Sequence, residues 1–171
     1  MTEPGDSVGR VIAEWGRVRP GLDVRPIAVV ARIARLRALL QEATEATFAE
    51  HGLTGADFQL LVTLLRAGPP HRLTQRALGA DLALTPGTIS VRVDRLVAAG
   101  LVERTVDPAD GRAVGVRLTE EGRGRAEAAI PAHLATEEHL LRALTPRQRD
   151  DLAALLAVLL ASLERDRGAG G

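Results

Sequence analysis

Small hydroxyl side chains and two arginines lie close together in one short segment, and their chemistry is that of hydrogen bonding to polar surfaces. The segment begins at a Thr-Pro pair, and the residues of interest are Thr85, Pro86, Gly87, Thr88, Ser90, Val91, Arg92 and Arg95. Ser and Thr hydroxyls can contact several base types or phosphates, and arginine can bind guanine through two parallel hydrogen bonds. These side chains suit contact with duplex DNA, and Arg92 and Arg95 would be the most selective of them.

The two arginines also have a structural alternative. Asp94 or Asp110 could hold either one in an intramolecular ion pair that orients the helix, and for Arg95 this role stands beside base contact. If Arg92 reads a base, its replacement by alanine should cost about 1 to 3 kcal/mol on a specific site. An equal loss on random DNA would instead indicate a phosphate contact.

Two helices joined by a tight turn are expected to position this segment. Thr74 is suited to cap the first helix. Its apolar face would be formed by Ala77, Leu78, Leu82 and Ala83. Thr85 is suited to cap the second helix, with Pro86 at the first helical position, where a missing N–H costs nothing. Gly100 follows the last apolar position of that helix and is typical of a helix C-terminus.

The spacing of apolar residues changes from helical to alternating after Leu101. A turn-rich cluster, Asp107 to Gly111, interrupts the alternation, which resumes and continues to Leu118. We therefore expect a two-stranded hairpin with Arg112 at its tip. An arginine on a loop is commonly just a solvated side chain, but beside a DNA-reading helix it could enter the minor groove, whose negative potential favours arginine.

The remaining sequence predicts helices on both sides of this unit. They span Ser7 to Arg19, Pro26 to His51, Thr54 to Ala67, Glu120 to Ala143 and Pro146 to Arg165. The last helix has a wide apolar face formed by Leu152, Leu155, Leu156, Leu159, Leu160 and Leu163. It could be an internal core helix. We favour a homodimer interface built with the N-terminal helices, because a two-fold protein can place two reading helices about 34 Å apart in successive major grooves.

The expected fold is mainly α with a small β-hairpin wing, a winged helix-turn-helix with a helical dimerisation region. At 171 residues the chain can hold one such module and an equal mass of scaffold. Residues 1–53 would supply N-terminal dimerisation helices and a possible ligand pocket. Residues 54–119 would bind DNA, and residues 120–171 would supply C-terminal dimerisation helices.

The charge of the chain predicts a moderate rather than a strong electrostatic contribution to DNA binding. The formal net charge is zero, and every basic residue is arginine. The winged segment has a slight excess of arginine over acidic residues. We expect a moderate salt dependence supported by helix N-termini and backbone amides, and a flat plot of log K against log salt would contradict this.

Catalysis finds little support in the sequence. Cysteine is absent, and the four histidines, His51, His71, His133 and His139, are dispersed without the i, i+4 spacing of a helical metal site. No Gly-rich phosphate loop follows a predicted strand. Glu137, Glu138, His133 and His139 could form an adventitious metal site, although solvated helix faces often carry such clusters. We expect no enzyme activity, no metal and no cofactor, and a cytoplasmic, nucleoid-associated protein without a membrane span.

The run from Leu73 to Gly122, with its VDRL, GLVER and LTEEG elements in order, resembles the multiple-antibiotic-resistance regulator (MarR) family of bacterial transcription factors. The resemblance covers almost the complete chain. It implies a triangular homodimer with interleaved terminal helices that binds a pseudo-palindromic operator and usually represses nearby genes. Asp110 and Arg112 match the family's wing aspartate and wing-tip arginine. Gly111 replaces an arginine often found between them, so one wing charge is missing.

The segment from Asp6 to Leu36 is similar to the leader helices of the urate-responsive branch of that family. In that branch a tryptophan, an aspartate and two arginines form an anion pocket. Trp15, Arg92 and Arg104 match by position, whereas Gln59 stands where the aspartate is expected, and Asp57 would point to another face. The resemblance implies a pocket for a small anion such as a carboxylate metabolite or a phenolic acid. In the alternative, Trp15 is an ordinary core residue and its helix serves dimer packing alone.

The sequence therefore predicts a sequence-specific regulator that binds double-stranded DNA, a homodimeric repressor released from its operator by a small anionic ligand. Two alternatives remain open. One is a winged-helix regulator that responds to no ligand. The other is a protein-interaction module without small-molecule sensing.

Overall fold

The computed structural model describes residues 5–106 and 114–169 and is mostly helical with one small sheet. The elements in chain order are α1 Ser7–Val18, α2 Arg25–Glu50, α3 Gly55–Arg66, β1 Arg72–Thr74, α4 Gln75–Asp81, α5 Pro86–Ala98, β2 Val102–Val106, β3 Val114–Leu118, α6 Glu120–Leu140 and α7 Pro146–Ala169. This order confirms the expected winged helix-turn-helix with helices on both sides. The predicted hairpin tip, with Asp110 and Arg112, lies outside the described residues.

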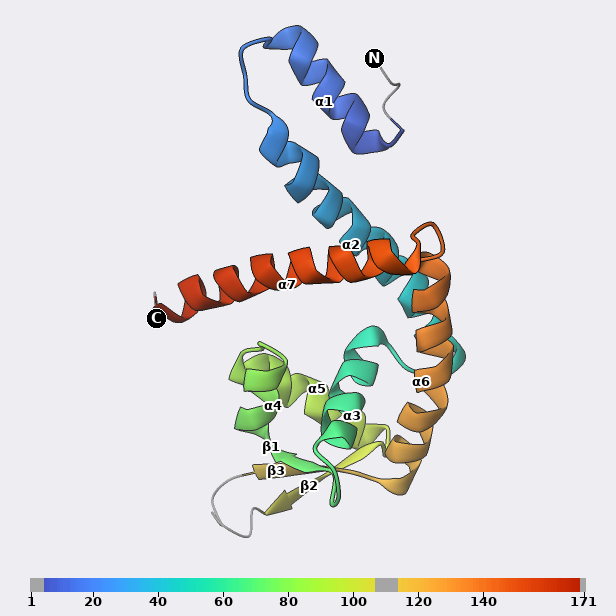
Figure 1. Cartoon of the computed structure of the whole chain (residues 1–171). Coiled ribbons are helices and arrows are strands. Elements are labelled where there is room, and N and C mark those ends of the chain that lie inside the picture. Colours follow the sequence, from blue (N-terminus) through green and yellow to red (C-terminus); the bar gives the residue numbers. More distant parts are fainter. Residues whose placement is uncertain (1–4, 107–113, 170–171) are drawn as a thin grey trace.

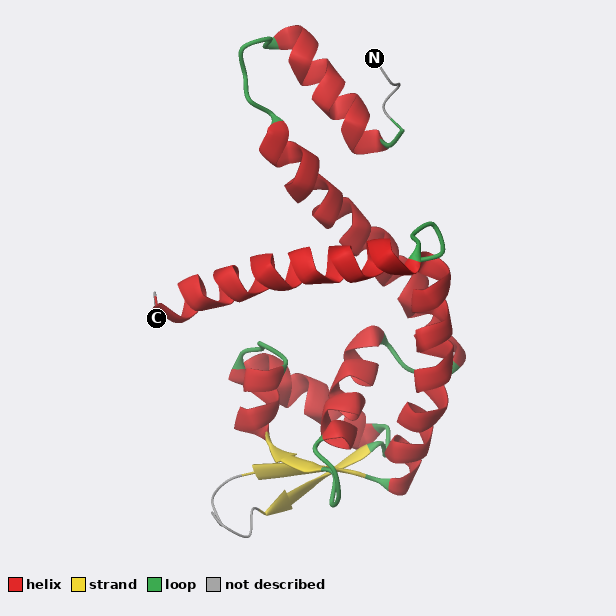
Figure 2. Ribbon diagram, in the orientation of Figure 1, coloured by secondary structure: helices red, strands yellow, loops and turns green. Residues whose placement is uncertain are grey.

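The chain is arranged as a lower lobe and a set of long helices above it (Figure 1). The lower lobe contains α3, α4 and α5 together with the sheet at its base. Helix α6 rises along one side of this lobe, and α2 and α1 extend upward from its top. Helix α7 runs across the molecule above the lobe, whereas the small sheet lies at the base of the lobe, on the side away from α7 (Figure 2).

Threonine side chains begin the helices of the lower lobe. The hydroxyls of Thr74, Thr85 and Thr119 accept hydrogen bonds from the amides of Ala77, Thr88 and Gly122 at 3.1, 3.3 and 3.0 Å. Each bond satisfies one of the amides that the first turn of a helix leaves unpaired. The predicted caps at Thr74 and Thr85 are confirmed, Thr119 caps α6 in the same way, and α5 begins with Pro86 as expected.

The sheet has one more strand than the sequence indicated. Its order is β1-β3-β2, with both pairs antiparallel. Arg117 of the central strand lies between Arg72 of β1 and Glu103 of β2. The expected two-stranded hairpin is confirmed as β2 and β3, and β1 adds a third strand that the sequence did not indicate. β1 has three residues, too few to show an alternating pattern. Ala83, expected on the apolar face of α4, instead follows the helix with φ of 52°.

The hydrophobic core lies in the lower lobe and at its junction with α2 and α6. Its largest fully buried side chains are Leu60, Leu61, Leu64, Leu78, Ile89, Val93, Leu96, Leu101, Val102 and Val116. Phe48 from α2 and Ala126 and Ala129 from α6 complete it. This packing holds α5 against α3 through one apolar face and leaves the opposite face of α5 open to solvent.

The apolar face of α7 is not buried within the chain. The leucines that form it range from 39 % exposed at Leu152 to 70 % exposed at Leu155. Helix α7 is therefore not an internal core helix of a single chain. Among the helices of the described ranges, none combines the length and apolar content that crossing a bilayer requires.

Candidate nucleic-acid interface

The N-terminal half of α5 presents a polar, exposed surface. Thr85, Pro86, Gly87 and Thr88 are exposed, Ser90 is half-buried, and Val91 is 70 % exposed. The Thr85 and Thr88 hydroxyls lie 2.9 Å apart and share a hydrogen bond. The side chains that pack inward from the same helix are Ile89, Val93 and Leu96. The helix therefore offers its first turn, with its partial positive charge and small hydroxyl groups, to a ligand in solvent.

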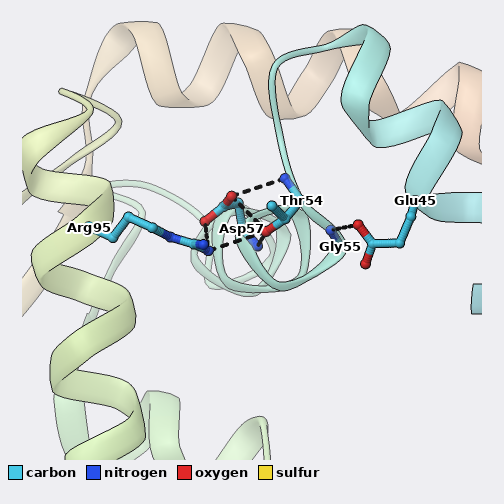
Figure 3. Close-up of polar contacts among 5 residues, drawn as sticks. All are labelled: Glu45, Thr54, Gly55, Asp57 and Arg95. Atoms are coloured by element: carbon cyan, nitrogen blue, oxygen red, sulfur yellow. Dashed lines mark hydrogen bonds and ion pairs between the residues drawn. The ribbon is translucent and has the colours of Figure 1, made fainter.

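Arg95 does not extend freely from this surface. Its guanidinium forms an ion pair with the Asp57 carboxylate and donates to the Thr54 hydroxyl at 3.2 Å (Figure 3). The structural alternative for Arg95 was correct in kind, but its described partner is Asp57 of α3 and not Asp94, and Asp110 lies outside the described residues. Asp57 is only 8 % exposed, so its ion pair with Arg95 lies at the edge of the core.

Asp94 has a different partner. Its carboxylate accepts a hydrogen bond from Arg104 at 2.6 Å, and both side chains are exposed. The pair joins α5 to β2, the strand that leads into the wing. Arg104, expected in an anion pocket, is thus held at the surface next to the reading helix.

Arg92 faces a large open cavity between the lower lobe and the long helices. The cavity has a volume of about 1000 Å³, and Gln59, Arg37 and Arg66 also line it. Its other charged or titratable lining residues are Glu45, Asp81, His133 and Glu137. Arg92 is half-buried and forms no hydrogen bond or ion pair with any other described residue. It is therefore placed to meet a molecule bound in this cavity.

The predicted pocket residues are only partly brought together within one chain. Gln59 and Arg92 line the same cavity. Trp15 lies on α1, 40 % exposed, and neither it nor Arg104 lines this cavity. Asp57 points away from the cavity toward Arg95, so the prediction that it would face elsewhere agrees with its position.

His133 supplies a feature of this cavity that the sequence did not indicate. Its ring lies 5.0 Å from both the Phe48 and Phe58 rings, and its Nε2 is 3.2 Å from a Glu137 oxygen. The imidazole thus forms part of an aromatic wall. Within the described part of the chain, no three His, Cys, Asp or Glu side chains gather closely enough to hold a metal ion.

Comparisons with known proteins agree with this architecture. A family model described as the MarR family matches residues 51–113. The transcriptional regulator PecS of Dickeya dadantii is 29% identical over 160 residues, which cover 94% of this chain and 96% of PecS. The transcriptional repressor NicR of Pseudomonas putida is 31% identical over 153 residues, 87% of this chain and 93% of NicR. The crystal structure of AbsC, a MarR family regulator from Streptomyces coelicolor, superimposes with a TM-score of 0.74 at 26% identity and covers 86% of this chain and 97% of AbsC.

Proposed function

The chain belongs to the MarR family of DNA-binding transcriptional regulators, and from that premise we propose that it acts as a homodimeric repressor on a pseudo-palindromic operator. It is not an enzyme, since its relatives are transcriptional regulators. We propose that it acts on the nucleoid, in the cytoplasm. The observation that carries the proposal is the exposed first half of α5, a helix N-terminus bearing Thr85 and Thr88 on a well-packed lobe.

The proposed reading surface combines two kinds of contact. The amide end of α5 and the hydroxyls of Thr85 and Thr88 suit phosphate oxygens and base edges. Val91 suits apolar contact with the methyl group of thymine. Gly87 and Ser90 leave room for the helix to approach the floor of the groove. Arg112 is proposed to reach the adjacent minor groove, with Asp110 near it at the DNA, as the family resemblance implies.

The proposal of a dimer is supported by apolar surface that one chain leaves uncovered. Large apolar side chains are exposed along three helices, with Val11 and Trp15 on α1, Val30 and Leu36 on α2, and the leucines of α7. Monomeric soluble proteins rarely expose contiguous apolar surface on this scale. A second copy of the chain would cover these helices and would set two α5 helices on one face of a DNA duplex.

The test begins with selection of bound duplexes from a random library, followed by fluorescence anisotropy on the selected sequence and on a shuffled one. We expect the selected site to be a palindrome and to bind at least about a thousandfold more tightly than the shuffled duplex. A protein-interaction module without a DNA function would show no preference between the two duplexes. In cells, deletion of the gene should raise expression from a promoter that carries the selected site.

We further propose that a small anion bound in the large cavity that Arg92 lines releases the protein from its operator. The support is the position of Arg92, a guanidinium on the reading helix that faces a cavity also lined by Arg37 and Arg66. An anion bound there would interact with Arg92 and so act directly on the position of α5. The two apolar aromatic side chains of the wall, Phe48 and Phe58, suit a ring such as that of a phenolic acid.

Benzoate, 4-hydroxybenzoate and urate are suitable probes for this part of the proposal. We expect at least one of them to weaken operator binding of the native protein, and the effect to disappear in Arg92→Gln. Arg76→Gln, which changes an exposed arginine outside the cavity, should keep the response. If no anion of the panel changes operator affinity or Trp15 fluorescence, the regulator acts without a ligand of this class.

A further inference from the structure

A cluster of polar groups at the start of α3 joins three helices. The cluster consists of Glu45, Thr54, Gly55, Asp57 and Arg95, and we call it the α3 cap cluster (Figure 3). The Thr54 hydroxyl accepts from the Asp57 amide at 3.2 Å and donates to the Asp57 carboxylate at 2.7 Å. The Thr54 amide donates to the same carboxylate oxygen at 3.0 Å. Together these contacts form a closed capping box.

Asp57 performs a second task with its other oxygen. One carboxylate oxygen completes the capping box, and the other accepts the hydrogen bond of the Arg95 guanidinium. Because the Asp57 side chain is nearly buried, its charge needs that partner, and loss of the partner would leave a carboxylate at the edge of an apolar core. The Arg95 side chain is 51% exposed, so solvent reaches the pair from one side.

The direction of Arg95 is the informative feature. Arg95 shares the outer side of α5 with the exposed Val91 and Asp94, yet its guanidinium is turned back to α3. Apart from the exposed pair of Asp94 with Arg104 of β2, the side chains that hold α5 on the lobe are apolar, and apolar contacts have little directional preference. A charge-assisted hydrogen bond has a preferred geometry. The pair with Asp57 therefore fixes the rotation of α5 about its own axis in a way that the buried Ile89 and Val93 do not.

The cluster also connects α5 to the long helix α2. The carboxylate of Glu45 accepts a hydrogen bond from the Gly55 amide at 3.0 Å, the first amide of α3. A side chain at position 55 would meet the Glu45 carboxylate, since a Cβ there would lie 2.5 Å from Oε1. Glycine thus permits the close approach of α2 to α3. The path α2, α3, α5 consists of directional contacts at each step.

We propose that Asp57 and Arg95 are positioning residues that set the angle of the reading helix on the α2 scaffold, and through that angle the sequence selectivity of DNA binding. The inference rests on the proposed function. It assigns Arg95 no contact with DNA, and it makes selectivity depend on an acidic residue of α3 that lies 38 positions away in the chain.

The test measures two dissociation constants for each variant, one on the selected palindrome and one on a shuffled duplex. The variants are Asp57→Asn, Arg95→Gln and the double variant, and Glu127→Gln is the matched control, since Glu127 is an exposed acid paired with Arg123 on α6. Asp57→Asn keeps an oxygen acceptor for the capping box, so the helix start is retained. Thermal unfolding of every variant shows which of them remain folded at the temperature of the assay.

We expect each single variant to lose about tenfold in the ratio of specific to shuffled affinity, while binding to the shuffled duplex changes less than about twofold. The double variant should be no worse than the single ones, because both remove the same contact. The control should keep the native ratio. A variant with altered stability but a native ratio would show that the pair is merely structural and would overturn the inference.

A direct DNA contact by Arg95 predicts the opposite pattern. Arg95→Gln would then weaken both duplexes if the contact is to phosphate, or the selected duplex alone if it is to a base, and in either case Asp57→Asn would free the guanidinium and leave binding equal or tighter. That result overturns the inference and leaves the proposed function intact. If the native protein itself shows no preference for any duplex, the proposed function fails, and the inference fails with it.

Discussion

Among single residues, Val91 carries the most direct prediction about the reading surface. It is 70 % exposed on α5, one turn beyond Gly87. Val91→Asp should lower affinity for every duplex by more than about tenfold, because a carboxylate would face the phosphates. Fluorescence anisotropy at fixed salt measures the change. Ala128→Asp, at an exposed position on α6, is the control, and native affinity in Val91→Asp would place the reading surface elsewhere.

Asp6 carries a prediction about pH. Its carboxylate accepts from the Gly9 amide at 2.7 Å and from Arg32 Nε at 2.8 Å, so it both caps α1 and ties it to α2. The hydrogen bond from Arg32, and then that from Gly9, holds the pKa of Asp6 below its ordinary value. A lowered pKa in the folded state means that the stabilisation is present above the ordinary pKa and is lost as the pH falls through the lowered one.

The emission of Trp15, the sole tryptophan and a residue of α1, reports this change. Asp6→Asn should shift the emission at neutral pH toward the value that the native protein reaches in acid. Asp23 provides the control, since its pKa is also lowered by its own hydrogen bond with Arg25, two positions away. Equal emission in Asp6→Asn and the native protein at neutral pH would show that α1 does not depend on this carboxylate.

The roles of individual arginines could be predicted only in part from the sequence. Thr54 and Asp57 form a capping box whose spacing is visible in the sequence. Nothing local in the sequence shows that Arg95 pairs with the second carboxylate oxygen of Asp57. Arg92 and Arg95 are three positions apart, and the sequence offered both as readers of bases, with an intramolecular ion pair as the stronger alternative for Arg95. The packing of α5 turns Arg92 into the cavity and Arg95 toward α3, and this depends on the tertiary arrangement of helices distant in the chain.

Helices and strands whose signals are local were predicted well. The caps at Thr74, Thr85 and Thr119 bond to amides three positions away, so sequence spacing suffices to identify them. The left-handed residue after α5, Gly100 with φ of 71°, was predicted for the same reason. β1 was missed because its identity as a strand comes from pairing with β3, some forty residues later, and not from its own three residues.

The start of α6 gives a prediction about packing between elements. Gly122 lies against Leu101, the residue that precedes β2, and a Cβ at position 122 would fall 1.9 Å from the carbonyl oxygen of Leu101. Because backbone must move to admit it, Gly122→Ala should destabilise the fold by about 1 to 3 kcal/mol. Urea denaturation measures the change in the free energy of unfolding.

Gly124 is the matched control for Gly122. It lies in the same helix, and a Cβ there would meet nothing within 4 Å. Gly124→Ala should therefore stabilise the protein, by about 0.5 to 1 kcal/mol, through the higher helix propensity of alanine. If the two substitutions had the same effect, the close approach of α6 to Leu101 would not exist in solution.

At the scale of the whole molecule, the lobe that carries α5 lies below the long helices whose apolar side chains are uncovered (Figure 1). The apolar pattern of α7 was visible in the sequence, but a pattern shows only that a face needs cover and not what covers it. The single chain leaves Leu155 and Leu159 exposed, which removes the internal alternative. The homodimer remains a proposal, and it rests on these leucines, which a single chain leaves exposed.

Substitutions that introduce charge on the apolar face of α7 test whether this helix forms the dimer interface. Leu155→Glu with Leu159→Glu should give a monomer whose lower lobe stays folded, since neither leucine contributes to the core of that lobe. Affinity for the palindrome should fall strongly, because each half-site would bind a separate chain. Ala154→Glu adds charge on the opposite side of the same helix and should leave the assembly unchanged. Sedimentation velocity distinguishes the two masses, and an unaltered mass in the leucine variant would move the interface away from α7.

The most direct measurement is the native mass of the complex formed on the selected palindrome and on a duplex with a single half-site. The account predicts two chains on the palindrome, bound as one unit without a stable one-chain intermediate, and markedly weaker binding to the half-site. One chain per palindrome, or equal affinity for the two duplexes, would contradict it.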